Sequence, residues 1–134
     1  IMKEKKQIEV VAAIIEHEGK FLCVQRGENK LDYISRKYEF PGGKMEPGES
    51  KKQTVVREIL EELDMVILPS SEFLTVQYEY PDFKLLMHSY ICSCASPMLK
   101  LKEHIDFKWL SAIEMGELDW AAADLPIVEK LAQI

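Results

Sequence analysis

The sequence predicts an α/β fold in which a mixed β-sheet is covered by helices. Three observations support this prediction. The chain has 134 residues, which suits one ordinary domain. Its strand-like runs follow one another as hairpins, and helical patterns come after the early strands and again after the late ones. We therefore expect residues 1–134 to form a single α/β domain.

The first part of the chain alternates strand-like runs with breaks. Ile8–Ile15 is β-branched and apolar, and a Glu-His-Glu-Gly turn leads to a second strand at Lys20–Gln25, which predicts a hairpin. A charged loop over 26–37 precedes a short strand at 38–40. The Pro-Gly-Gly sequence that follows should end this strand and open a loop over 40–49.

A helix and further strands make up the rest of the chain. Ser50 and Gln53 form a capping-box pattern, and the apolar stripe after them predicts a helix that ends near Asp64. Strand-like runs follow at 72–80, 84–94 and 107–110, the first two joined as a long hairpin. Helical patterns return at Ser111–Met115 and at Asp124–Ile134, where Asp124 is the expected N-cap.

The composition excludes several classes of protein. With 47% hydrophobic and 30% charged residues, the chain can fold around a core. A formal net charge of -6 argues against binding to polymeric nucleic acid, which depends on clustered Lys and Arg. No apolar stretch approaches the roughly 20 residues that span a bilayer, and the lysine-rich start Met2–Lys6 lacks the apolar segment of a signal peptide. We expect a soluble cytoplasmic protein without a membrane partner.

The cysteines do not indicate a disulfide framework. Cys23, Cys92 and Cys94 are odd in number and irregular in spacing. Cys92 and Cys94 would share one face of a strand and could bind a soft metal, but no second Cys/His pair accompanies them. We expect buried thiols in a reducing compartment.

Three glutamates lie on one face of the expected helix. Glu58, Glu61 and Glu62 stand at positions i, i+3 and i+4, so their carboxylates crowd together. The repulsion is a few tenths of a kcal/mol per pair, and the cluster is therefore either solvated or neutralised by cations. A Glu-rich helix alone is most often a solvated surface. The double glycine Gly42-Gly43 ahead of it favours a ligand site, because a backbone without side chains can approach a ligand closely.

These residues resemble the signature of the Nudix hydrolases. Gly43, Glu49 and the run from Arg57 to Glu62 have the spacing of the Nudix box, which departs from the family pattern only at Asp64, where a glycine is usual. Aspartate can adopt the left-handed conformation of a helix C-terminus at a cost of about 1 kcal/mol, so the helix should survive. The resemblance extends over nearly the whole chain, especially to MutT-like nucleoside triphosphate pyrophosphohydrolases and their CTP branch. It implies the Nudix α/β/α sandwich.

The resemblance also implies a cofactor and its ligands. Mg²⁺ is the expected metal, and Mn²⁺ is expected to substitute for it. By matching positions, Glu58 and Glu62 are metal ligands, while Glu61 is either a further ligand or the group that orients or deprotonates the attacking water. The carbonyl group of Gly43 matches another ligand, and Glu103 matches a carboxylate that serves as ligand or base.

Other residues of the motif have supporting roles. Arg57 should hold Glu49 and the loop in place by an ion pair, and on a helix it is expected to point away from the glutamate face. Gly42 allows the close approach of the backbone. His104 is expected to be only an exposed neighbour of Glu103, and His17 lies in a solvated turn.

Substrate contacts are expected elsewhere along the chain. Arg26 and Lys44 are candidates to bind the phosphates. Asp124 falls where MutT-like relatives place a residue that contacts the base, and an ionised carboxylate there would favour a base edge with N–H donors, such as cytosine N4 or guanine N1 and N2. The alternative for Asp124 is a purely capping role. Candidates for stacking on the base are Phe83, Trp120 and Tyr80.

We therefore expect a Mg²⁺-dependent enzyme that converts a nucleoside triphosphate to a monophosphate and pyrophosphate and cleanses the nucleotide pool, as a monomer or homodimer. Both (d)CTP-like substrates and 8-oxo-dGTP stay open. One alternative is a hydrolase of ADP-ribose or a dinucleotide polyphosphate, whose extra signatures the sequence lacks. The other is a non-catalytic nucleotide-binding Nudix domain, against which the intact set Glu58, Glu61 and Glu62 argues.

Overall fold

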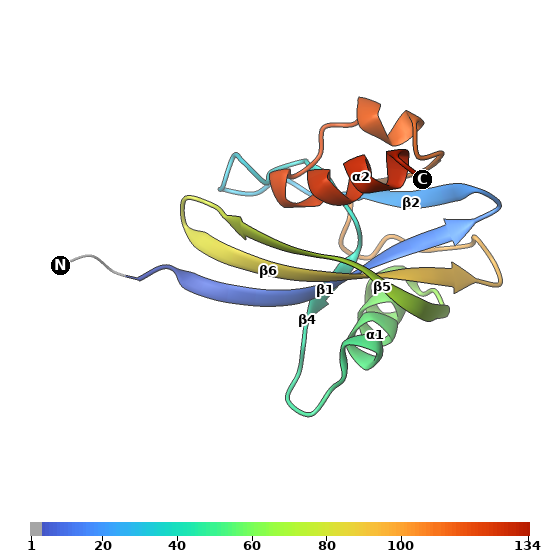
Figure 1. Cartoon of the computed structure of the whole chain (residues 1–134), viewed down its shortest axis with the longest axis horizontal. Coiled ribbons are helices and arrows are strands. Elements are labelled where there is room, and N and C mark those ends of the chain that lie inside the picture. The colour runs from blue at the N-terminus through green and yellow to red at the C-terminus, as the bar shows by residue number, and fades with distance from the viewer. Residues whose placement is uncertain (1–3) are drawn as a thin grey trace.

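A mixed β-sheet runs through the centre of the molecule and carries a helix on each face (Figure 1). The computed structural model describes residues 4–134, and residues 1–3, where the lysine-rich start begins, lie outside the described residues. Within residues 4–134 the sheet has seven strands, in the order β3-β2-β1-β6-β5, with β4 paired to β1 and β7 paired to β2. The strands are β1 (Lys6–His17), β2 (Lys20–Gln25), β3 (Tyr38–Glu39), β4 (Gly42–Lys44), β5 (Ile67–Glu79), β6 (Phe83–Cys94) and β7 (Asp106–Leu110).

The central strand β1 supplies side chains to both hydrophobic cores. Val11, Ala13 and Ile15 pack into the core on one face of the sheet, whereas Ala12 and Ile14 pack into the core on the other. This alternation follows from the two-residue period of a strand. β1 is parallel to β6 and antiparallel to β2, and β5 and β6 form an antiparallel hairpin. The predicted mixed sheet and both predicted hairpins are confirmed.

Helix α1 (Lys51–Leu63) covers one face of the sheet and forms as its sequence predicts. Ser50 and Gln53 make both hydrogen bonds of the capping box. Val55, Ile59 and Leu63 are buried against the sheet. The helix ends at Asp64, which adopts the left-handed conformation with φ 56°. The absence of the usual glycine therefore leaves the helix intact.

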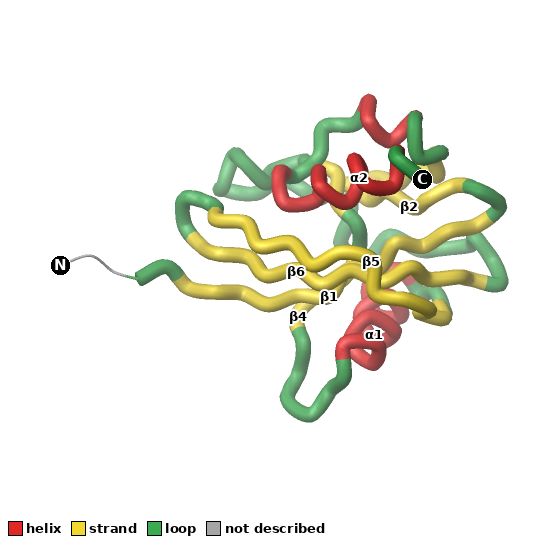
Figure 2. The backbone as a smooth tube through the Cα atoms, in the orientation of Figure 1, coloured by secondary structure: helices red, strands yellow, loops and turns green. Residues whose placement is uncertain are grey.

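Helix α2 (Leu125–Ala132) packs on the opposite face through Ile127, Val128 and Leu131. Figure 2 shows the strands as a layer between α2 above and α1 below. Two short 3-10 helices precede α2, η1 (Glu114–Glu117) and η2 (Ala122–Asp124). The predicted helix at Ser111–Met115 thus forms a few residues later, as η1. Among residues 4–134, no helix is both long enough and apolar enough to cross a membrane.

The prediction of an unbroken loop over 40–49 is wrong. Gly42–Lys44 forms the strand β4, antiparallel to β1, with Gly42 opposite Ala12. A Cβ atom at Gly42 would overlap the carbonyl oxygen of Val11, so only glycine lets the two strands come this close. This pairing positions the double glycine beside helix α1.

The cysteines are free, as expected. Cys23 and Cys92 are buried and Cys94 is partly buried. Burial raises the pKa of the Cys23 and Cys92 thiols to about 12, so neither thiol is prone to react.

Candidate functional site

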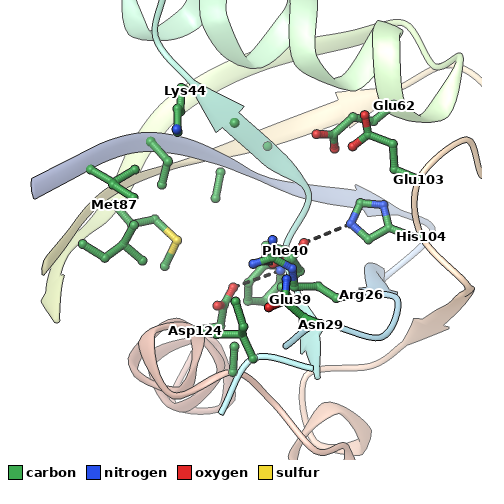
Figure 3. Close-up of a pocket in the computed structure, with 18 of the residues that line it drawn as sticks. Arg26, Asn29, Glu39, Phe40, Lys44, Glu62, Met87, Glu103, His104 and Asp124 are labelled. Carbon is green, nitrogen blue, oxygen red and sulfur yellow. Dashed lines mark hydrogen bonds and ion pairs between the residues drawn. The ribbon is translucent and has the colours of Figure 1, made fainter. Parts of the chain in front are cut away.

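A cavity of about 660 Å³ lies between the sheet and the loops that follow β2 and β6 (Figure 3). Its size suits a small-molecule ligand, since such sites usually span about 300–1,000 Å³. Most of the residues singled out from the sequence line it. They are Arg26, Gly42, Gly43, Lys44, Glu62, Tyr80, Phe83, Glu103 and Asp124. Glu58, Glu61, Glu49, Arg57 and Trp120 lie outside this wall.

One end of the cavity is acidic. Glu62, at the C-terminal end of α1, is only 8% exposed, and Figure 3 shows it beside Glu103. Burial, together with the nearby charges of Glu58 and Glu103, raises the pKa of Glu62 to about 9. Within residues 4–134, Glu62 Oε2 is buried without a hydrogen-bond partner. A cation at this end would stabilise the charged carboxylate of Glu62 and would give its unpaired Oε2 atom a partner.

Gly43 connects the acidic end to the glutamate face of α1. A Cβ atom at position 43 would overlap the carboxyl group of Glu58. The backbone of β4 at Gly43 therefore lies directly against this carboxylate. Oxygen donors of this kind suit hard cations such as Mg²⁺.

Arg57 connects the loop before α1 to two glutamates of the helix. Its Nε donates to Glu49 Oε2 at 2.6 Å, which confirms the predicted ion pair. Its Nη1 also donates to Glu58 Oε1 at 2.9 Å and to Glu61 Oε2 at 3.2 Å. The prediction that Arg57 points away from the glutamates is wrong, because the long side chain curls over the helix surface and reaches the i+4 position. The hydrogen bonds from Arg57 lower the pKa of Glu49 to about 2.

The glutamates are therefore divided between two environments. Glu62 and Glu103 line the cavity, whereas Glu61 is exposed and bonded to Arg57. Within the described residues, no three His, Cys, Asp or Glu side chains converge as a complete metal-binding cluster. Carboxylates that come together only partly are compatible with Mg²⁺, which usually takes one or two protein carboxylates and completes its shell with waters and substrate phosphates.

The middle of the cavity contains a polar pair that the sequence did not reveal. His104 Nε2 lies 2.9 Å from Glu39 Oε2, and Glu39 Oε1 lies 3.6 Å from Arg26 Nη1. The side chain of His104 is only 6% exposed, so the expectation of an exposed residue is wrong. The only signals in the sequence are that His104 follows Glu103 and that Glu39 precedes Phe40.

The opposite end of the cavity contains Asp124. Its side chain makes no capping hydrogen bond with α2, which excludes a purely capping role, and Oδ1 instead accepts a hydrogen bond from the Phe40 amide at 2.9 Å. Burial, and next the charge of Glu39, raise the pKa of Asp124 well above its ordinary value. Burial therefore disfavours the charged form of this carboxyl group relative to an aspartate in water.

Aromatic side chains flank the Asp124 end. Tyr80 and Phe83 both line the cavity, with ring centroids 5.0 Å apart. Trp120 is 5% exposed, donates from Nε1 to the Met115 carbonyl and stacks on Phe40. Trp120 thus belongs to the core, and its predicted stacking on a base is wrong.

The fold and the site together identify the class of protein. The NUDIX domain model matches residues 5–131, and the chain belongs to this family. The chain is a Nudix hydrolase with the predicted α/β fold, and Nudix hydrolases generally need a divalent metal.

Its relatives are curated enzymes and solved structures. The chain is 36% identical to the CTP pyrophosphohydrolase of Escherichia coli K12 over 124 residues, which cover 92% of this chain and 90% of that protein. It is 29% identical to the 8-oxo-dGTP diphosphatase of the same organism, over 96% of this chain and 99% of that protein. The crystal structure of a MutT protein from Methanosarcina mazei Go1 superposes with a TM-score of 0.86 at 30% identity, covering 98% and 97% of the two chains.

Proposed function

We propose that this Nudix hydrolase cleaves a nucleoside triphosphate with water to give a nucleoside monophosphate and pyrophosphate, with Mg²⁺ as cofactor. The observation that carries the proposal is a single cavity that joins an acidic end, at Glu62 and Glu103, to an aromatic end, at Asp124 and Phe83. The first suits a metal and phosphates, and the second suits a base. The names of the two Escherichia coli relatives support it. A role in cleansing the cytoplasmic nucleotide pool accords with this reaction.

The acidic end fits a divalent metal. Glu62 Oε2 is buried with no partner among residues 4–134, and the backbone of Gly43 lies against Glu58. We infer that Glu58, Glu62 and the Gly43 carbonyl hold Mg²⁺, for which Mn²⁺ can substitute, with Glu103 as a further ligand or base. When bound, the metal would neutralise phosphate charge and activate the attacking water. Glu61 is assigned either to the metal or to the orientation of this water.

The remaining charged side chains bind and position the substrate. Arg26 and Lys44 line the cavity from the loop after β2 and from β4, and both can neutralise phosphate oxygens. Arg57 acts indirectly, because it ties Glu49 of the loop and Glu58 of the helix together. The loop that precedes α1 is thereby held beside the acidic end.

The burial of Asp124 widens the expected recognition of the base. An ionised carboxyl group accepts from N–H donors of a base, whereas a protonated one also offers an O–H donor to an acceptor such as cytosine N3 or guanine O6, and burial disfavours the charged form. The sequence alone suggested an ionised group that only accepts. Phe83 lines the cavity and is only partly buried, so it would stack on the base, while the buried Tyr80 supports it from behind. CTP-like and 8-oxoguanine nucleotides both satisfy this arrangement.

A substrate screen tests the proposal. Purified protein would be incubated with Mg²⁺ or Mn²⁺ and with canonical, oxidised or methylated nucleoside triphosphates, and released pyrophosphate and nucleoside monophosphate would be quantified. We expect equimolar pyrophosphate and monophosphate from at least one triphosphate, and none in the presence of EDTA. Release of inorganic phosphate in place of pyrophosphate, or binding with no hydrolysis, would exclude the proposed reaction.

A further inference from the structure

The loop between β6 and β7 brings Glu103 over the acidic end of the cavity. Backbone hydrogen bonds fix this loop on both sides of Glu103. They join Lys100 to Leu63 at 2.9 Å, Lys102 to Glu62 at 3.3 Å and Ile105 to Gln25 at 2.9 Å. The side chain of Glu103 makes no hydrogen bond or ion pair with any residue in the range 4–134. The position of its backbone is therefore set by its neighbours in the chain.

His104 makes the side-chain bond that secures the tip of this loop. Its Nε2 lies 2.9 Å from Glu39 Oε2, across 65 residues of sequence. Because a carboxylate only accepts hydrogen bonds, Nε2 is the donor. Glu39 belongs to β3, where it pairs with Val24, and its second oxygen faces Arg26. The bond therefore fastens the loop to a fixed point of the sheet.

The other ring nitrogen of His104 sets it apart from a structural histidine. Nδ1 is buried and has no partner among the described residues, although the ring lines the cavity. His88 offers the comparison, since its Nε2 lies 2.7 Å from Glu9 and its Nδ1 lies 3.3 Å from Thr75. A histidine kept only for stability satisfies both nitrogens, because an unpaired buried polar atom is destabilising. His104, by contrast, has one ring nitrogen at the cavity without a partner in the range 4–134.

We propose that His104 is a positioning residue that holds Glu103 toward the metal end of the cavity through its hydrogen bond to Glu39. The proposal rests on the proposed function, because it concerns the same cavity. Without this bond the tip of the loop is tied only through its backbone, and the Glu103 carboxylate loses its defined direction. Displacement of a catalytic group by about 1 Å can lower a rate by about 100-fold, and a partial loss of order should cost about 10-fold.

Paired substitutions separate this role from simple stabilisation. The amide nitrogen of His104→Gln can occupy the place of Nε2, whereas that of His104→Asn falls short of Glu39. We expect His104→Asn to lower kcat about 10-fold and to weaken Mn²⁺ binding in the absence of nucleotide by a similar factor, with KM changed less than about twofold. His104→Gln should recover most of both losses. Mn²⁺ binding is measured by electron paramagnetic resonance titration, and melting temperature by circular dichroism.

Two further variants provide controls. His88→Asn breaks the comparable bond to Glu9 outside the cavity, and should lower the melting temperature while kcat and Mn²⁺ binding stay at wild-type values. In a Glu103→Gln background, adding His104→Asn should lower kcat and Mn²⁺ affinity by less than about twofold, because the carboxylate that His104 positions is already gone.

Several results would overturn the proposal. Equal losses in His104→Asn and His104→Gln would show that the bond to Glu39 is not what matters. If the double variant loses kcat by the product of the two single losses, His104 does not act through Glu103. If His104→Asn is unfolded at the assay temperature, Glu39→Ala tests the same bond from the other side, because it removes the acceptor, and should reproduce the loss of Mn²⁺ affinity. Mn²⁺ binding separates the role of His104 from the proposed hydrolysis of a nucleoside triphosphate. It can be measured even if the protein hydrolyses no triphosphate.

Discussion

Replacement of Gly43 by alanine should remove activity without unfolding the protein. A Cβ atom at this position would lie 2.7 Å from Glu58 Oε1 and closer still to two other atoms of the same carboxyl group. Favourable van der Waals contact needs roughly 3.5 Å, so the carboxyl group must move by about 1 Å. A displacement of this size costs about 100-fold, or about 2.7 kcal/mol of transition-state stabilisation. We expect kcat/KM for pyrophosphate release to fall by this factor.

Gly42→Ala is the matched control. There the added Cβ would overlap the carbonyl oxygen of Val11 in the central strand, which cannot rotate away, whereas the Glu58 side chain can. Gly42→Ala should lose at least about 1–3 kcal/mol of stability in thermal unfolding followed by circular dichroism. Gly43→Ala should melt within a few degrees of wild type. If Gly43→Ala keeps more than half of the wild-type kcat/KM, the placement of Glu58 beside Gly43 plays no part in the reaction.

Three other substitutions probe individual side chains. Glu62→Gln should raise the free energy of unfolding of the metal-free protein by about 1–3 kcal/mol at pH 8, because it removes a carboxyl group whose charged form is disfavoured by burial and by the nearby charges of Glu58 and Glu103. Since folding raises the pKa of Glu62 from 4.5 to about 9, wild-type stability should fall as pH rises through this window, and urea titrations should show a smaller fall in the variant. Folding lowers the pKa of Glu49 from 4.5 to about 2, so its pairing with Arg57 stabilises the protein above pH 4.5. The difference in melting temperature between wild type and Glu49→Gln should therefore close as pH falls toward 2, and a constant difference would contradict this. Asp64→Gly should raise the free energy of unfolding, measured by urea titration, by at most about 1 kcal/mol, because φ is 56° at this position and glycine adopts this conformation without strain. The kcat of this variant should not change.

Local patterns predicted the fold where local interactions determine it. The capping box of Ser50 and Gln53 and the left-handed Asp64 depend only on neighbours within α1, and both formed as expected. The short strand β4 was missed because glycine normally interrupts strands, whereas here its pairing with β1 requires a residue without a side chain. β5 begins at Ile67, earlier than expected, because β-bulges near Glu72 break the alternation that marks a strand.

The candidate site also combines residues that a local sequence pattern indicates with contacts that no local pattern indicates. The spacing of the Nudix box singled out Gly43 and Glu62, and both line the cavity. The bond between Glu39 and His104 and the bond between Phe40 and Asp124 join residues 65 and 84 positions apart, and no local pattern indicates either one. The raised pKa of Asp124 could not be foreseen for the same reason, since it comes from burial by segments remote in sequence.

Hydrolysis by the Glu58→Gln variant bears most directly on the assignment of the chain as a metal-dependent pyrophosphohydrolase. Pyrophosphate release would be measured with Mg²⁺ on every nucleotide that the wild-type protein accepts, alongside melting temperatures. The amide keeps the shape of Glu58 and removes its charge, so kcat should fall at least about 100-fold while the fold persists. A rate within about twofold of wild type on every accepted nucleotide would contradict the assignment of the chemistry to the acidic end of the cavity.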